Sequence, residues 1–169
     1  TEFPKHASEG EGQMRFSYLS AQNFYGLDIL PFAIEIAKVT MMIARKLAID
    51  ELHISEQPLP LDNLDHNFIA ADALLTPEGL PAQWPKADVI IGNPPFLDAR
   101  KMTKELGRNC VALLEQKYPD VPRRADHCVY WIRKAHDHLP PCTAEDAMAG
   151  RAGLVGTQNI RNNYSRIGG

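Results

Sequence analysis

A short apolar run that is stopped by two consecutive prolines constrains the fold of this chain more than any other feature. Residues 88–92 read Asp-Val-Ile-Ile-Gly, and Asn93, Pro94, Pro95 and Phe96 follow directly. A continuously apolar centre is typical of a parallel strand that is buried on both faces. Proline has a fixed φ and no N–H to donate, so the hydrogen-bond ladder ends there. The run therefore predicts a buried parallel strand that leads into a rigid turn.

Three other segments have the composition of short strands. They are residues 23–28, 68–72 and 152–156. Pro31 follows the first of them, and proline is favoured in the first turn of a helix. We therefore expect a helix to begin close to the end of the first strand.

Helical periodicity occurs in two segments between these strands. Apolar residues recur at steps of three and four within residues 32–47, and again within residues 126–139. We expect the first apolar stripe to face a sheet. It consists of Phe32, Ile36, Val39, Ile43 and Leu47. Strands that alternate with helices predict an α/β fold with a mostly parallel sheet and helices on both faces.

The charges predict a basic segment at residues 97–124 and a shorter one from Arg151 to Gly169, which holds three arginines and no acid, in an otherwise acidic chain. The net charge is -3, yet residues 97–124 hold seven basic and four acidic side chains. We interpret residues 1–22 as a loose leader, residues 23–169 as one domain, and residues 97–124 as a basic insert in that domain. The insert is compatible with a face turned toward nucleic-acid phosphates and equally with an ordinary solvated surface.

Cysteine spacing and hydropathy exclude several classes of protein. Cys110, Cys128 and Cys142 are odd in number and have no C-x-x-C spacing, so we expect neither a disulfide framework nor a zinc site. No other metal site is expected. No run approaches the roughly 20 apolar residues of a membrane helix, and the N-terminus lacks the apolar core of a signal peptide. We expect a soluble, cytoplasmic protein that does not bind a membrane.

Polar side chains follow three of the predicted strands. Asp28, Asp72 and Asn93 each stand at a strand end, where open parallel sheets bind their ligands. We expect the three to converge on one crevice. Asp28 is placed to accept the hydroxyls of a ribose, or alternatively to cap the following helix. Asp72 is placed to accept an adenine amine, or to form a turn.

The turn that begins at Asn93 suits chemistry on an aromatic amine. The Asn93 side-chain oxygen and the Pro94 carbonyl are acceptors, and Phe96 offers a flat face for an unstacked base. Two acceptors that hold both hydrogens of an exocyclic amine draw its lone pair out of the ring. The nitrogen then becomes a better nucleophile.

Residues 93–96 resemble the fourth motif of the amino-group DNA methyltransferases, whose signature is [DNS]-P-P-[YFW]. The second, third, fifth and sixth motifs of that family resemble residues 24–28, 70–74, 126–131 and 150–157, in the same order. The chain is most similar to large restriction-modification enzymes that fuse a methyltransferase to a specificity region and often to a nuclease. The resemblance implies a Rossmann-like class I methyltransferase fold and transfer of a methyl group from S-adenosylmethionine to adenine N6 in DNA.

The resemblance also implies roles for individual residues. The flipped target adenine of double-stranded DNA would be held by the catalytic residues Asn93, Pro94, Pro95 and Phe96. S-adenosylmethionine would be bound by Asp28, Ile29, Asp72, Ala73, Asn93 and Asp126. The remaining domains of a parent enzyme are the other expected partners.

One departure from the family concerns its first motif, a glycine loop that wraps the methionine part of the cofactor. Gly10 and Gly12 lack the preceding strand that this motif requires. In the family, that strand lies between those that here end at Asp28 and Gly92, so we expect a partial domain whose central first strand is missing. These two strands are expected either to pair directly or to leave edges that another copy fills. We also expect such a fragment to bind the cofactor poorly and to turn over little.

Other acceptors of the methyl group stay open under the same motif. Protein glutamine side chains in release factors are methylated by enzymes in which Asn-Pro-Pro-Tyr is usual, and some relatives modify an RNA base. Enzymes that act on cytosine N4 usually have Ser or Asp in place of Asn93. A further alternative is an inactive fragment that serves only as an assembly or DNA-docking surface.

Overall fold

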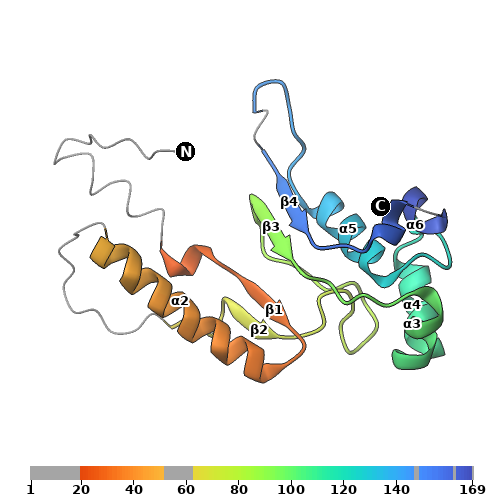
Figure 1. Cartoon of the computed structure of the whole chain (residues 1–169), viewed down its shortest axis with the longest axis horizontal. Coiled ribbons are helices and arrows are strands. Elements are labelled where there is room, and N and C mark those ends of the chain that lie inside the picture. Colours follow the sequence, from red (N-terminus) through yellow and green to blue (C-terminus); the bar gives the residue numbers. More distant parts are fainter. Residues whose placement is uncertain (1–19, 52–62, 147–148, 162, 169) are drawn as a thin grey trace. The chain divides into compact units, whose positions relative to one another are not determined.

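The chain divides into two compact units, Thr1–Asp72 and Ala73–Gly169, each with its own hydrophobic core. Within the part of the chain that the structure describes, no helix is long and apolar enough to cross a membrane. The computed structural model describes residues 20–51, 63–146, 149–161 and 163–168 (Figure 1).

The first unit is a pair of parallel strands with one long helix. β1 runs parallel to β2, with Gly26 beside Phe68 and Asp28 beside Ala70. Figure 1 shows the helix, α2, lying along this pair. The strands predicted at 23–28 and 68–72 are confirmed in shorter form. The elements of this unit are η2 (Ala21–Asn23), β1 (Gly26–Asp28), α2 (Pro31–Glu51) and β2 (Phe68–Ala70).

The expected loose leader is packed into the first unit at its described end. The side chain of Ser20 accepts a hydrogen bond from the N–H of Gln22 at 3.2 Å and so caps η2. Ala21 is buried in the core of this unit. The domain therefore begins before residue 23, and residues 1–19 lie outside the described residues.

The prediction for the buried face of α2 is wrong. The five residues of the predicted stripe, from Phe32 to Leu47, are between 50% and 76% exposed. Ile34 is the buried residue of the helix instead, and Ala37 and Met41 pack beside it. Phe32 and Ile34 lie about 200° apart around a helix with 3.6 residues per turn. Because α2 carries two apolar stripes, periodicity could not select the face that packs on β1 and β2.

The second unit also has two parallel strands, which are joined by a helical segment. β3 is parallel to β4, with Val89 beside Arg151 and Gly92 beside Leu154. The strand predicted at 88–92 and the helix predicted at 126–139 are confirmed, and the strand predicted at 152–156 lies slightly earlier. The elements are β3 (Val89–Gly92), α3 (Ala99–Glu105), α4 (Arg108–Lys117), α5 (His127–His138), β4 (Arg151–Leu154), η3 (Gln158–Arg161) and α6 (Asn163–Gly168).

Two parts of the sheet prediction are wrong for the described residues. Each unit contains one parallel pair of strands in place of the expected continuous sheet, with β1 beside β2 and β3 beside β4. β3 was expected to be buried on both faces, yet Val89 and Ile91 are 59% and 83% exposed. The apolar side chains on one face of β3 would be buried only if a helix or another strand covered that face. No described helix covers it. The expectation of helices on both faces of a sheet is not met in either pair, where α2 packs on β1 and β2 and α5 contacts β4.

The expected basic insert is part of the core of the second unit. Residues 97–124 contain both α3 and α4, and each helix buries one side chain, Met102 and Leu114. Both side chains belong to the main apolar cluster together with Val129 of α5. Four of the basic residues of this segment are exposed on these two helices, and Arg123 and Arg124 follow α4. The four are Arg100, Lys101, Lys104 and Arg108.

The segment before β3 is anchored on α5 by aromatic and polar contacts. The Trp84 indole N–H donates to the carbonyl of Ala73 at 2.8 Å, and the Tyr118 hydroxyl donates to the carbonyl of Leu74 at 2.8 Å. The rings of Tyr118 and Tyr130 pack edge to face, with their centres 5.9 Å apart. Burial raises the pKa of Tyr130 to about 12, so its hydroxyl stays neutral at physiological pH. These contacts set the position of the strand that ends at the Asn-Pro-Pro turn.

Candidate active site

The Asn-Pro-Pro-Phe turn leaves β3 with one proline buried and the side chains on either side of the prolines exposed. Pro94 is fully buried, whereas Asn93 is exposed and Phe96 is 48% exposed. The Gly92 carbonyl, just before the turn, accepts the N–H of Val155 at 2.9 Å. The turn thus continues directly from the β3–β4 pair, and the side chains of Asn93 and Phe96 are accessible from outside the protein.

The residues after Phe96 are held by the beginnings of two helices. The carbonyl of Leu97 accepts the N–H of His127, the first residue of α5, at 2.8 Å. The Asp98 carboxylate caps α3 by accepting the N–H groups of Arg100 and Lys101 at 3.0 and 2.9 Å. The N–H of Lys101, more than that of Arg100, lowers the pKa of Asp98. The chain from the turn into α3 is therefore well ordered.

Asp126 precedes α5 and uses its side chain differently from Asp98. It stands at the N-cap position, but its carboxylate makes no capping hydrogen bond. Its backbone N–H donates to the buried hydroxyl of Ser165 in α6 at 3.1 Å. The main chain at Asp126 is therefore fixed, and its carboxylate faces a small cavity.

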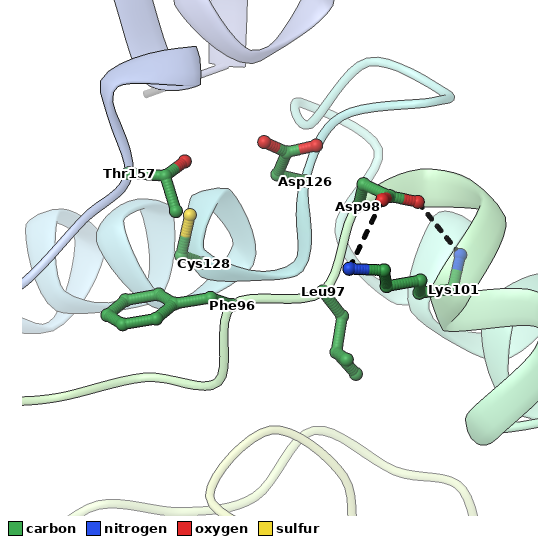
Figure 2. A pocket seen from close by; sticks show the side chains of 7 residues that line it. All are labelled: Phe96, Leu97, Asp98, Lys101, Asp126, Cys128 and Thr157. Atoms are coloured by element: carbon green, nitrogen blue, oxygen red, sulfur yellow. Dashed lines mark hydrogen bonds and ion pairs between the residues drawn. The ribbon is translucent and has the colours of Figure 1, made fainter.

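This cavity has a volume of about 170 Å³ and opens beside the ring of Phe96. Figure 2 shows the Phe96 ring on one side of the hollow and Thr157 with Asp126 on the other. The residues that line it come from the turn, from the starts of α3 and α5, and from the segment after β4. They are Phe96, Leu97, Asp98, Lys101, Asp126, Cys128 and Thr157.

The Cys128 thiol lines this cavity but is not accessible to solvent. The residue is fully buried, and the N–H of Thr157 donates to its sulfur. Burial raises the pKa of the thiol, and the negative charge of Asp126 adds to the rise. A thiol with a raised pKa carries little thiolate at neutral pH, so Cys128 is not placed as a nucleophile.

The predicted site residues fall on both units. Phe96 and Asp126 are brought together in the cavity, which Asn93, Pro94 and Pro95 do not line. Ala73, at the start of the second unit, is buried. The convergence of the acids after β1 and β2 on Asn93 stays a prediction.

The acids of the first unit are at the surface. Asp28 and Asp72 are exposed, and Ile29 is 70% exposed. One oxygen of Asp28 accepts the N–H of Leu30 at 2.8 Å, which forms a local turn just before α2 rather than a cap on the helix itself.

Sequence reasoning missed Leu97, Asp98, Lys101, Cys128 and Thr157 as lining residues. Thr157 had a usable signal, because it directly follows the strand predicted at 152–156, although β4 itself ends three residues earlier at Leu154. Applying the rule for strand ends to this fourth strand would have identified it. The other four residues carry no such signal, since their place depends on how α3 and α5 pack. Among the described residues, no group of three or more His, Cys, Asp or Glu side chains is arranged to hold a metal ion.

Comparison with known proteins identifies one family. Residues 5–165 match the family model described as MmeI, DNA-methyltransferase domain. No curated protein and no solved structure matches the chain.

Proposed function

This chain belongs to the MmeI DNA-methyltransferase domain family, whose members methylate DNA in restriction-modification, and from that premise we propose that it transfers a methyl group from S-adenosylmethionine to adenine N6. The observation that carries the proposal is the Asn-Pro-Pro-Phe turn, with Pro94 buried and with Asn93 and Phe96 exposed. A buried proline holds the turn rigid, and rigid placement of acceptors is what an amine substrate requires.

The proposed chemistry assigns one task to each residue of the turn. The Asn93 side-chain oxygen and the Pro94 carbonyl accept the two hydrogens of the adenine amine and raise the electron density on N6. Phe96 stacks on the base that has left the duplex. S-adenosylmethionine, when bound, supplies a methyl group that is activated by a positively charged sulfur. The amine nitrogen would form a bond to the methyl carbon as the carbon–sulfur bond breaks and its electron pair stays on sulfur, and the nitrogen would then release one proton to water.

The proposed cofactor contacts follow the resemblance to the family. The strand-end acids Asp28 and Asp72 are exposed oxygen acceptors, which fits ribose hydroxyls and an adenine amine. Ile29, Ala73, Asn93 and Asp126 are the other proposed contacts. We infer that these 169 residues by themselves bind the cofactor weakly, since they carry no glycine-rich first motif.

The proposed DNA contacts use the outer faces of α3 and α4. Arg100, Lys101, Lys104 and Arg108 are all exposed and follow the turn closely in sequence. Positive side chains beside a flipped base neutralise the phosphates that flank it. This placement supports double-stranded DNA as the partner, together with any further domains of a parent enzyme.

The proposal is tested by expressing the gene that encodes this chain in cells that lack other DNA methyltransferases. Genomic DNA, RNA and protein are then digested and analysed by mass spectrometry. We expect N6-methyladenine in the DNA, at one recurring sequence that sequencing of modified bases identifies. If the analysis finds N4-methylcytosine in DNA, a methylated RNA base or methylglutamine, and no N6-methyladenine, then that group rather than adenine is the methyl acceptor. A gene product that is present but modifies none of these would favour the docking alternative.

We also propose that the free strand edges support self-association. In the described pairs, β1 and β3 each have one strand neighbour, and an open edge offers N–H and C=O groups to another strand. Light scattering behind a sizing column, over a hundredfold range of protein concentration, should show a dimer or a larger species. A constant monomer mass at the highest concentration would contradict this proposal.

A further inference from the structure

The cavity beside Phe96 contains a buried polar atom that has no hydrogen-bond partner in the structure. The hydroxyl oxygen of Thr157 is buried and unpaired among the described residues. Buried hydroxyls are nearly always paired, because an unpaired one loses its hydrogen bonds to water and gains none in the protein. Such an atom in the wall of a cavity requires an explanation, and a ligand that enters the cavity would provide one.

The backbone around Thr157 holds this hydroxyl in place. The N–H of Thr157 donates to the sulfur of Cys128, and its carbonyl accepts the N–H of Ile160 at 3.1 Å. Both main-chain groups are thus paired, at the point where β4 leads into η3. Figure 2 shows the side chain above Cys128, on the same side of the hollow as Asp126. The hydroxyl is therefore the one group of Thr157 that is left for a ligand.

The size and chemistry of the cavity indicate which part of a ligand it holds. Its volume of about 170 Å³ is well below the roughly 300 Å³ at which pockets for drug-sized ligands begin. It therefore suits one ring system rather than a whole nucleotide cofactor. One wall is the face of Phe96, and the other wall carries a hydroxyl and a carboxylate, which together can donate to and accept from a heterocycle.

We propose that the Thr157 hydroxyl donates a hydrogen bond to a ring nitrogen of the flipped adenine and so positions the base on Phe96. This proposal rests on the proposed function, because it assigns the cavity to the methyl acceptor. It makes Thr157 a substrate-binding residue that helps to distinguish adenine from rings without that nitrogen. A site that hydrogen-bonds its substrate discriminates strongly against an analogue that cannot form the bond.

The proposal predicts opposite effects of Thr157→Val on stability and on activity. Valine has the shape of threonine and lacks the hydroxyl, so it removes an unpaired buried group from the free protein. The melting temperature should be unchanged or higher, while kcat/KM for a duplex with the target sequence should fall about 10- to 100-fold, as loss of one buried hydrogen bond predicts. Thr157→Ser keeps the hydroxyl and should retain most of the activity. Thr103→Val, on the exposed side of α3, is the matched control and should behave as wild type.

The decisive experiment replaces the target adenine by 1-deaza-, 3-deaza- or 7-deazaadenine, each of which lacks one ring nitrogen. Wild type should lose about 10-fold or more in kcat/KM with one of the three, and Thr157→Val should show no further loss with that analogue. Equal losses in both proteins with all three analogues, or wild-type activity of Thr157→Val on adenine, would overturn the role of Thr157. If Thr157→Val melts at a lower temperature, Thr157→Ala is measured with the same analogues. All these measurements use the full product of the gene that encodes this chain, and its failure to methylate the unmodified duplex would instead overturn the proposed function itself.

Discussion

Asn93→Ala is expected to lower the rate of DNA methylation at least about 100-fold, the typical cost of removing one group that stabilises charge in a transition state. Alanine removes the side-chain acceptor that we assign to the adenine amine. The side chain is exposed at the end of β3, so its truncation removes no core packing. The loss should therefore appear in kcat, with DNA binding changed only a few-fold.

This expectation is tested by single-turnover methylation of a target duplex, with DNA affinity measured in parallel by fluorescence anisotropy. Asn93→Asp keeps an oxygen acceptor and should retain part of the activity that alanine loses. Asn109→Ala, an exposed asparagine of α4, is the matched control and should be as active as wild type. If KM for DNA rises and kcat is unchanged, Asn93 contributes to DNA binding and not to the chemical step.

Lys134→Ala is expected to lower the free energy of unfolding by about 3 kcal/mol, which is the range for breaking a buried network of charged hydrogen bonds. Lys134 is a buried cation of α5, only 9% exposed. Its ammonium donates to the carbonyl of Ala82 at 2.5 Å and to the hydroxyl of Tyr118 at 3.3 Å. It also lies 5.0 Å from the ring centre of Trp84. Alanine would leave the Ala82 carbonyl without this donor and would remove the cation from the aromatic ring.

Urea denaturation followed by circular dichroism measures this loss. Lys134→Met keeps most of the apolar stem and should cost less than alanine, because only the hydrogen bonds and the charge are lost. Lys104→Ala, on the exposed side of α3, should change stability by no more than about 0.5 kcal/mol. Equal stability of Lys134→Ala and wild type would show that the buried ammonium contributes no net stabilisation.

The turn was predictable from sequence because its cause is local. Two consecutive prolines after an apolar run stop a strand wherever they occur, and β3 ends at Gly92 for that reason. The start of α2 at Pro31 is another local effect. The class of family was also readable at this level, since the resemblance based on short motifs indicated a DNA methyltransferase, as does the family model that matches residues 5–165.

The face of a helix and the burial of a strand were not predictable in this way. α2 has apolar side chains on two sides, so only its contacts with β1 and β2 select Ile34 over Phe32. β3 has the composition of a buried strand, yet Ile91 is exposed, because burial depends on which layer covers it. In both cases the hydrophobic pattern indicates which side chains can be buried. Which of them are buried depends on the elements that pack against the helix or strand.

The sequence by itself therefore determined the ends of β1 and β3, the Asn-Pro-Pro-Phe turn and the class of family, because each follows from residues adjacent in the chain. Only the tertiary structure decided that Thr157 and Asp126 share a cavity with Phe96, and that Lys134 lies buried beneath Trp84 and Tyr118. Those contacts join segments far apart in sequence, and they form because α3, α4 and α5 bury a common apolar core. Packing, rather than local propensity, places these side chains next to one another.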